Sequence, residues 1–240
     1  MRISVDLHIH SDLSPCADQL MSPGNIVGMA VVNGLDAIAI TDHNSSYNIP
    51  AAMKIAAEYG VVLVPGMELE TCEEIHVVCL FADFEQLEKF QKTVNKSYNP
   101  VRNFTDIFGE QHIYNEKDEV VGEWEHMLLS PTGISVDNVF GLADSLGGIA
   151  FPAHVDRDSY SVLSTFGMLP YGYPHNFVEI SCQCDTERLK ERYPGLKNYR
   201  LLRSSDAHYC EEIQENGAIL QVEEISTVGI IRALKDGKLM

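Results

Sequence analysis

The stretch ISVDLHIHS, residues 3–11, combines the pattern of a β-strand with two histidines one residue apart. Its apolar residues alternate with other residues, which is the period-two pattern of a strand that we expect to end at His8. On an extended segment, His8 and His10 project to the same side of the chain. The stretch therefore predicts a strand whose end presents two imidazole rings together, suited to bind one metal ion or two neighbouring ions.

A short apolar strand followed by polar residues recurs along the chain. Strands are predicted over residues 2–8, 36–40, 61–64, 75–81, 149–151, 177–181, 199–203 and 218–222. Helices are predicted over residues 23–33, 50–59, 85–95, 135–146, 159–166, 186–192 and 227–235, the first and last with Ser22 and Ser226 as N-caps. This alternation predicts an α/β fold with a parallel sheet, and the strands are numerous enough to close a barrel with its functional groups at the C-terminal strand ends.

Residues 99–132 interrupt the alternation, because they are polar and irregular. A small hairpin is expected around residues 115–118. We interpret the segment as a short insertion into a single domain that spans residues 1–240, since it is too short and too polar to form its own core. A lid over the site is one role for the segment that contains Glu123, Trp124 and Glu125. The alternative is an ordinary surface loop.

The formal net charge of −18 argues against a broad nucleic-acid surface, which needs Lys and Arg to neutralise phosphates. It still allows a nucleotide or a short nucleic-acid end at a local metal site. No apolar stretch is long enough for a membrane span, and no export signal is recognised. The six cysteines lack the spacing of a disulfide framework or a zinc ribbon, so we expect free thiols in a cytoplasmic protein.

Histidines and carboxylates gather at or near the ends of the predicted strands. The set comprises His8, His10, Asp42, His43, Glu68, His76, His154, Asp206 and His208. Because strand ends meet on one face of a barrel, these side chains are expected to share one site. Imidazole and carboxylate together suit zinc, manganese or iron. Such ions can be bridged by Glu68, clamp a phosphate ester and supply a bound hydroxide.

Other polar residues have simpler interpretations. Asp42 can orient the ring of His43 rather than bind an ion itself. His112, His126 and His175 are expected to be ordinary hydrogen-bonded residues outside the site.

The ordered motifs resemble those of the PHP (polymerase and histidinol phosphatase) family. They are Asp6-Leu-His8-Ile-His10-Ser, Thr41-Asp42-His43, Gly66-Met-Glu68, Ala153-His154 and Ser205-Asp206-Ala-His208. The resemblance implies a distorted (β/α)7 TIM-like barrel, two or three divalent ions of zinc, manganese or iron, and phosphoester hydrolysis. By position, the ligands that it implies are His8, His10, His43, Glu68, His76, His154, Asp206 and His208.

One position departs from the family pattern. Shortly after the second histidine the family commonly carries an Asp or a His, whereas this chain reads Ser14-Pro15-Cys16-Ala17-Asp18. Pro15 cannot bind a metal ion. Asp18 is the favoured ligand, because an oxygen suits a hard or borderline metal. The alternatives are that Cys16 fills this third metal position or that neither residue does.

A substrate phosphate needs a cationic donor beside the metals. Arg157 lies three residues after His154, so we expect it to reach the site and act in catalysis. Arg203 is a weaker candidate, and both arginines have structural ion pairs as the alternative. His154 and His208 are the candidates to protonate the leaving oxygen, provided that ion binding leaves them free.

These residues favour a metal-dependent phosphoesterase acting on a small phosphomonoester or a nucleotide, with a short nucleic-acid end as the second substrate class. A metal-stabilised regulatory or scaffold barrel with weak or lost catalysis is the alternative. An amide or ester hydrolase is a third possibility. The sequence leaves the oligomeric state open.

Overall fold

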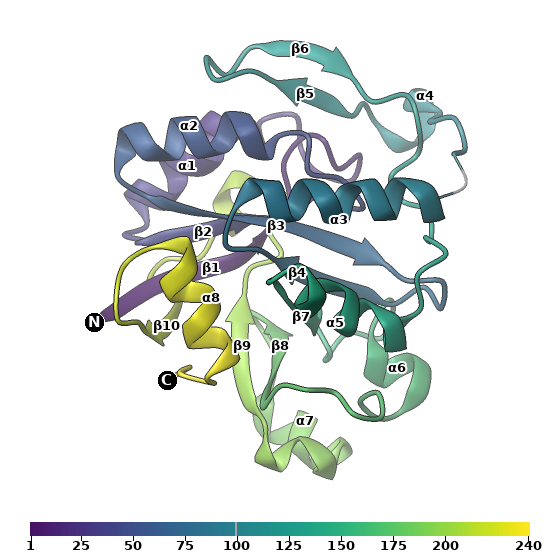
Figure 1. Cartoon of the computed structure of the whole chain (residues 1–240), viewed down its shortest axis with the longest axis vertical. Coiled ribbons are helices and arrows are strands. Elements are labelled where there is room, and N and C mark those ends of the chain that lie inside the picture. Colours follow the sequence, from purple (N-terminus) through teal and green to yellow (C-terminus); the bar gives the residue numbers. More distant parts are fainter. Residues whose placement is uncertain (99) are drawn as a thin grey trace.

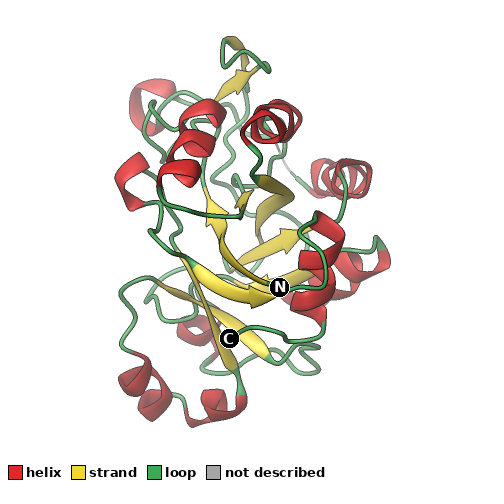
Figure 2. Ribbon diagram, turned by 90° about the vertical axis from the view of Figure 1, so that its left-hand side faces the viewer, coloured by secondary structure: helices red, strands yellow, loops and turns green. Residues whose placement is uncertain are grey.

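The computed structural model describes residues 1–98 and 100–240, and its centre is a curled six-stranded sheet (Figures 1 and 2). The strands are β1 (Arg2–Ile9), β2 (Ala37–Ile40), β3 (Val62–Glu70), β4 (His76–Leu80), β5 (His112–Tyr114), β6 (Val120–Glu123), β7 (Ile149–Pro152), β8 (Phe177–Ser181), β9 (Arg200–Ser204) and β10 (Ala218–Gln221). The helices are α1 (Pro23–Val32), α2 (Ile49–Tyr59), α3 (Phe84–Ser97), α4 (Thr105–Phe108), α5 (Val136–Ser145), α6 (Val162–Phe166), α7 (Thr186–Arg192) and α8 (Thr227–Lys235). Two short 3-10 helices, η1 (Pro194–Asn198) and η2 (Cys210–Glu212), complete the described elements.

The strand order in the main sheet is β10-β1-β2-β3-β4-β7, and the sheet is mixed rather than parallel. β1, β2 and β3 run parallel to one another, but β4 is antiparallel to both β3 and β7, and β10 is antiparallel to β1. The expectation of a wholly parallel sheet is therefore wrong. It fails at β4 because a tight turn, and no helix, joins β3 to β4, and such a connection can only return the chain antiparallel.

β3 changes its partner strand at Gly66. Residues up to Pro65 pair with β2, and residues from Gly66 to Glu70 pair with β4. A Cβ atom on Gly66 would lie 2.7 Å from Thr41 Cγ2 and 2.9 Å from Leu80 Cδ2, so no larger residue fits without displacing its neighbours. This bend extends β3 past the end predicted from its apolar run, and it carries Glu68 into the site.

β8 and β9 form a separate parallel pair beside the main sheet (Figure 1). Val155 N donates to Glu179 O at 3.0 Å on the side of β7, and Asp206 N donates to His8 O at 2.9 Å on the side of β1. The molecule thus has a mixed α/β fold with a curled, half-barrel sheet. The described residues do not show a complete (β/α)7 barrel.

The predicted caps of the first and last helices are confirmed. Ser22 accepts a hydrogen bond from Asn25 N and precedes Pro23, the first residue of α1. Ser226 accepts from Gly229 N at 3.0 Å and so begins α8. These helices pack against opposite sides of the sheet, where Ile26 and Val27 of α1 join one buried cluster and Ile230 and Leu234 of α8 join another.

The inserted segment forms a β5–β6 hairpin that lies beside α1 and α2 (Figure 1). Buried Gln111 fixes its base, because its amide donates to the carbonyls of Trp124 and His126 and accepts from Leu128 N. The hairpin expected around residues 115–118 is confirmed. Among the residues that the structure describes, no helix has the length and apolar character needed to traverse a bilayer.

Candidate metal centre

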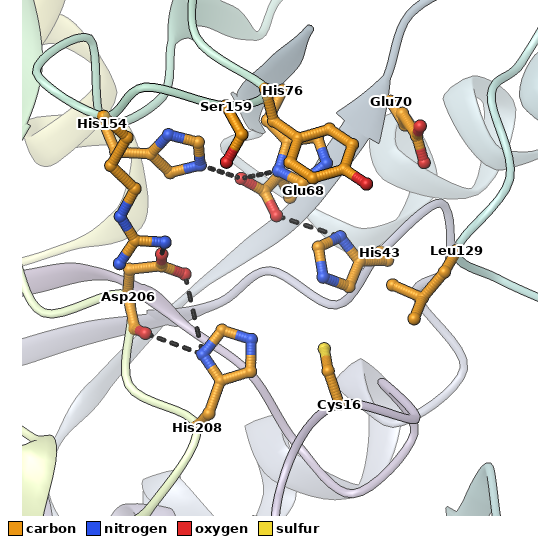
Figure 3. Close-up of a pocket in the computed structure, with 12 residues that line it drawn as sticks. Cys16, His43, Glu68, Glu70, His76, Leu129, His154, Ser159, Asp206 and His208 are labelled. Atoms are coloured by element: carbon orange, nitrogen blue, oxygen red, sulfur yellow. Dashed lines mark hydrogen bonds and ion pairs between the residues drawn. The ribbon is translucent and has the colours of Figure 1, made fainter. Parts of the chain in front are cut away.

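Six strands bring the predicted ligands together. His8 lies in β1 and His10 directly follows it, His43 follows β2, His76 begins β4, His154 follows β7, and Asp206 and His208 follow β9. Glu68 differs from the expectation, because it lies within β3 rather than after a strand. Six of these eight side chains line an open cavity, the metal cup (Figure 3). His8 and His10 do not line it and are fully buried.

Glu68 is the centre of this group, with five imidazole rings around its carboxylate. Oε1 lies 3.2 Å from His8 Nε2, 3.1 Å from His76 Nδ1 and 3.3 Å from His154 Nε2. Oε2 lies 3.0 Å from His43 Nδ1 and 3.4 Å from His10 Nε2. Burial would raise the pKa of Glu68, but His76, His8 and His43 hold that pKa well below its ordinary value. The carboxylate is therefore ionised at neutral pH.

The spacing of these atoms fits shared metal ligands. Two ligand atoms that each bind one ion at about 2.0–2.1 Å, in tetrahedral or octahedral geometry, lie roughly 2.8–3.4 Å apart. The Nε2 atoms of His8 and His10 are 3.1 Å apart, which lies within this range. Both Glu68 oxygens and Nδ1 of His43 are buried without a well-formed hydrogen bond. The donor set therefore fits divalent ions.

The donors fall into three overlapping groups within the described residues. They are His8, His10, Glu68 and Asp206; His43, Glu68 and His76; and His10, His43 and His208. His154 adds a further nitrogen beside Glu68 Oε1. The first two groups mix imidazole and carboxylate, whereas the third consists of imidazoles alone.

Glu179 was missed by the sequence analysis, yet it orients two of the ligands. Its Oε1 accepts a hydrogen bond from His8 Nδ1 at 2.9 Å and another from His154 N at 3.1 Å. The first contact fixes the proton of His8 on Nδ1 and leaves the Nε2 lone pair for an ion. Burial alone would lower the pKa of His8, but Glu179, Glu68 and Asp206 raise it well above its ordinary value, so a bound ion would take the place of a proton on Nε2. Glu179 lies mid-strand in an apolar run without a histidine, so no local motif pointed to it.

Asp42 acts on the ring of His10 through Ser14, and not on the ring of His43 as the sequence suggested. Ser14 Oγ donates to Asp42 Oδ1 at 2.7 Å and lies 3.1 Å from His10 Nδ1. It also accepts from His43 N at 3.2 Å. This chain of hydrogen bonds leaves His10 Nε2 without a proton, facing the other ligands.

Two of the ligands lie on left-handed backbone. His154 has φ +28° and Asp206 has φ +52°, a region that L-residues other than glycine rarely adopt. Neighbouring contacts hold both residues, because His154 N is bound by Glu179 and Asp206 N by His8 O. The strain turns both side chains toward the metal cup at the points where β7 and β9 end.

The structure separates Asp18 from the site and brings Cys16 to it. Asp18 Oδ1 accepts from Leu20 N at 2.9 Å in a local turn, and Asp18 does not line the metal cup. The thiol of Cys16 points into the cup between His43 and His208 (Figure 3). Burial would raise the pKa of Cys16, but the His43 charge and hydrogen bonds with His208 and His43 lower it to about 5. The preference for Asp18 therefore does not fit the geometry, because the turn directs its carboxylate elsewhere.

The two candidate arginines have different surroundings. Arg157 Nη1 lies 2.6 Å from Asp206 Oδ2, and its side chain is 43% exposed at the cup. Arg203 donates to the backbone carbonyls of Ser181 and Cys182, so it holds the loop after β8 and does not face the cup. The segment expected as a lid also lies elsewhere: Glu123, Trp124 and Glu125 line a separate hollow with Arg102 and His126. From residues 99–132, the described part that reaches the cup is Leu129.

Two further features of the cup were not foreseen. Glu70 lines it beside Tyr160, and burial raises the pKa of Glu70 to about 7. The ring of Tyr160 stacks on His76 with centroids 4.6 Å apart. A second hollow, the side hollow, adjoins the cup and shares Cys16, Arg157, Asp206 and His208 with it. Its other walls carry Ser181, Cys182, Gln183, Ser205, Tyr209, Glu211 and Glu212.

Known proteins resemble this chain in part of the sequence and across the fold. The 5'-3' exoribonuclease Rnm of Salmonella typhimurium is 39% identical over 83 residues, which covers 32% of this chain and 27% of that protein. The endonuclease PfuEndoQ of Pyrococcus furiosus superposes with a TM-score of 0.72 at 19% identity, over 100% of this chain and 58% of that one. A structure of Endonuclease Q with a 27-mer duplex substrate gives a TM-score of 0.68 at 18% identity, over 98% of this chain and 57% of that one.

The chain spans little more than a quarter of the exoribonuclease and less than two thirds of the endonuclease. At 19% identity, the similarity to the endonuclease is a similarity of fold. The sequence model of one family, described as the PHP domain, matches residues 6–160. That match covers β1 to β7 with the ligands His8 to His154, and the chain accordingly belongs to the PHP domain family.

Proposed function

We propose that this chain, acting as one domain over residues 1–240, is a metal-dependent phosphoesterase that hydrolyses a phosphomonoester or a nucleotide phosphate. The observation that carries this proposal is the convergence of buried imidazoles on Glu68, at the 3.0–3.4 Å spacing of shared metal ligands. Membership of the PHP domain family supports it. Two or three zinc, manganese or iron ions, when bound, would neutralise phosphate charge and make a water molecule more acidic.

Arg157 is the proposed phosphate-binding residue. A guanidinium carries five N–H donors, so Arg157 can keep its contact with Asp206 and still donate to a phosphate oxygen in the cup. The contact with Asp206 places the guanidinium at the boundary between the metal cup and the side hollow.

His154 and His208 are proposed primarily as ion ligands. His154 Nε2 faces Glu68, and His208 Nδ1 donates to Asp206 O at 2.8 Å, which leaves Nε2 of His208 unprotonated. Each can protonate a leaving oxygen only in a state in which no ion uses its Nε2 atom. Asp18 is not part of the proposed ligand set, because its carboxylate is held in the turn with Leu20.

The walls of the two cavities favour a small substrate over a long polyanion. Arg157 is the one Lys or Arg side chain among the described residues that line them, and Glu70, Glu211 and Glu212 add negative charge. The side hollow offers hydroxyl and amide groups from Ser181, Gln183 and Ser205. It therefore suits an uncharged, hydroxyl-rich leaving group, such as a sugar or a nucleoside.

The first experiment measures turnover of p-nitrophenyl phosphate and of nucleoside monophosphates by metal-free protein reloaded with Mn²⁺ or Zn²⁺. We expect metal-dependent turnover that inorganic phosphate inhibits. His154→Ala should lose bound metal and activity together. Normal metal content without turnover of any phosphate ester would indicate the scaffold alternative, and amide cleavage that phosphate does not inhibit would indicate the amide hydrolase.

A nucleic-acid end is the second candidate substrate, supported by relatives described as an exoribonuclease and an endonuclease. The salt dependence of substrate binding distinguishes a nucleotide substrate from a nucleic-acid end. A protein that neutralises Z phosphates of a single strand shows a slope of about −0.7Z for log affinity against log salt. We expect KM for a nucleotide to depend weakly on salt. A steep dependence with a labelled RNA oligonucleotide, at higher kcat/KM than the nucleotide, would favour the nucleic-acid end.

A further inference from the structure

The three donor groups at the metal cup differ in charge. The two that contain Glu68 have at least one carboxylate, whereas the group of His10, His43 and His208 has none. His10 is moreover engaged elsewhere, because its Nε2 lies 3.1 Å from both His8 Nε2 and Asp206 Oδ1. His43 and His208 are thus left as two imidazoles of a donor group that contains no carboxylate.

Both remaining rings turn a nitrogen toward the same space. His208 Nδ1 donates to Asp206 O at 2.8 Å, so its lone pair lies on Nε2. His43 Nδ1 lies 3.0 Å from Glu68 Oε2, so Nε2 of His43 is the atom on the side away from Glu68. In Figure 3 the sulfur of Cys16 points into the space between these two rings.

The loop that carries Cys16 is held in this position by backbone hydrogen bonds. Asp18 N donates to His208 O at 2.9 Å, and Ala17 N donates to Ser14 O at 2.9 Å. Ser14 itself is bound to Asp42 and to His43 N. The loop is therefore attached on one side to the segment of His43 and on the other to that of His208, which fixes the thiol between them.

We propose that Cys16 is the anionic ligand of a third metal ion, which it binds together with His43 and His208. This inference rests on the metal-dependent function proposed above and deepens it. The S–H bond of Cys16 breaks, its proton passes to solvent, and a sulfur lone pair forms the bond to the ion. A thiolate with two imidazoles is the softest donor set in the cup and selects zinc over manganese, whereas the groups built on Glu68 accept either.

Cobalt reports this bond without any need for turnover. Metal-free protein is titrated with Co²⁺ while the near-ultraviolet absorption of thiolate-to-cobalt charge transfer is recorded. We expect the band to appear as cobalt fills the sites of the unchanged protein. It should vanish in Cys16→Ser and persist in the matched control Cys182→Ser, because Cys182 lies in the side hollow with its thiol on Ser204 O.

Metal counting and alkylation complete the test. Cys16→Ser should bind one zinc ion fewer per chain than the unchanged protein, and Cys16→His should restore the count without restoring the cobalt band. Zinc should also protect Cys16, an exposed residue, from iodoacetamide, as read by mass spectrometry of its peptide. A cobalt band that survives in Cys16→Ser, no band in the unchanged protein, or alkylation unaffected by zinc would each overturn the proposal. Absent phosphatase activity with an intact band would instead count against the proposed function alone.

Discussion

The guanidinium of Arg157 contacts Asp206, a proposed metal ligand, and also lines the cup in which a substrate phosphate would lie. Arg157→Ala should remove a charge-assisted hydrogen bond worth about 1.5–3 kcal/mol. We therefore expect kcat/KM to fall roughly ten- to a hundredfold. Arg157→Lys should restore part of the loss, since it keeps the charge but not the planar fork.

The control for Arg157 is the exposed Arg188→Ala, which should retain full activity. Metal content should remain normal in both variants, because a guanidinium is not a ligand. Full activity of Arg157→Ala with normal metal content would mean that Arg157 only fixes Asp206.

Glu179 acts on the site through His8 and the backbone of His154, so its removal should weaken metal binding. Losing a carboxylate that orients a metal-binding histidine typically costs 10–100-fold in affinity or activity. We expect Glu179→Gln to lower zinc affinity by about this factor, measured by competition with a chelator. The exposed Glu187→Gln serves as the control. Unchanged zinc affinity in Glu179→Gln would refute the orienting role.

Individual ligands were predictable where a histidine or acid follows an apolar run, as with His43 and Asp206. The role of Glu179 and the choice between Cys16 and Asp18 were not predictable from the sequence. Glu179 alternates with apolar neighbours in β8, so it resembles the exposed face of a strand although it is buried. The choice between Cys16 and Asp18 depends on the turn at Leu20, whose hydrogen bonds are set by the packing of a loop against His208.

At the level of elements, the β5–β6 hairpin is joined to the loop of the first histidines by one buried carboxylate. Asp12 Oδ2 accepts from Tyr114 OH at 2.7 Å and from His112 Nδ1 at 2.7 Å. Tyr114→Phe removes the first donor and leaves Asp12 short of a partner. We expect a loss of about 1–3 kcal/mol in the free energy of unfolding, measured with urea.

Metal content should be unaffected in Tyr114→Phe, because Asp12 is not among the donor groups at the cup. The exposed Tyr59→Phe is the control and should change the stability little. Equal stability of the two variants would show that the hairpin is not held by Asp12.

The order of strands and helices was largely predictable, because buried strands are short apolar runs and most helices, α2 and α4 excepted, begin after a Ser or an Asp. The direction of β4 was not predictable from its own residues. An apolar run such as the one over residues 76–80 fits a parallel or an antiparallel strand equally well. What decides its direction is the turn after Glu70 and the bend at Gly66, which depends on contacts with Thr41 and Leu80 from two other segments.

At the scale of the whole molecule, part of the net charge of −18 comes from carboxylates buried around the metal cup. Four carboxylates with little or no exposure belong to the cup or to the residues that orient its ligands, namely Glu68, Asp206, Glu179 and Asp42. Burying charges without compensation is costly, and the imidazoles offset this only in part. The fold therefore concentrates electrostatic strain at the ends of its strands, and a divalent ion would relieve it.

Metal removal should accordingly lower the stability of the whole fold. A ligand that binds only the folded state contributes about 2.7 kcal/mol at a concentration of 100 Kd. For a chain of 150–250 residues, each 1 kcal/mol shifts Tm by roughly 2–4 °C. EDTA should thus lower the Tm of metal-loaded protein by about 5–11 °C, and added zinc should restore it. Differential scanning calorimetry of His154→Ala provides the control, since this variant should respond less to EDTA. An identical Tm with and without EDTA, for protein whose zinc content is confirmed beforehand, would mean that the ions do not stabilise the fold.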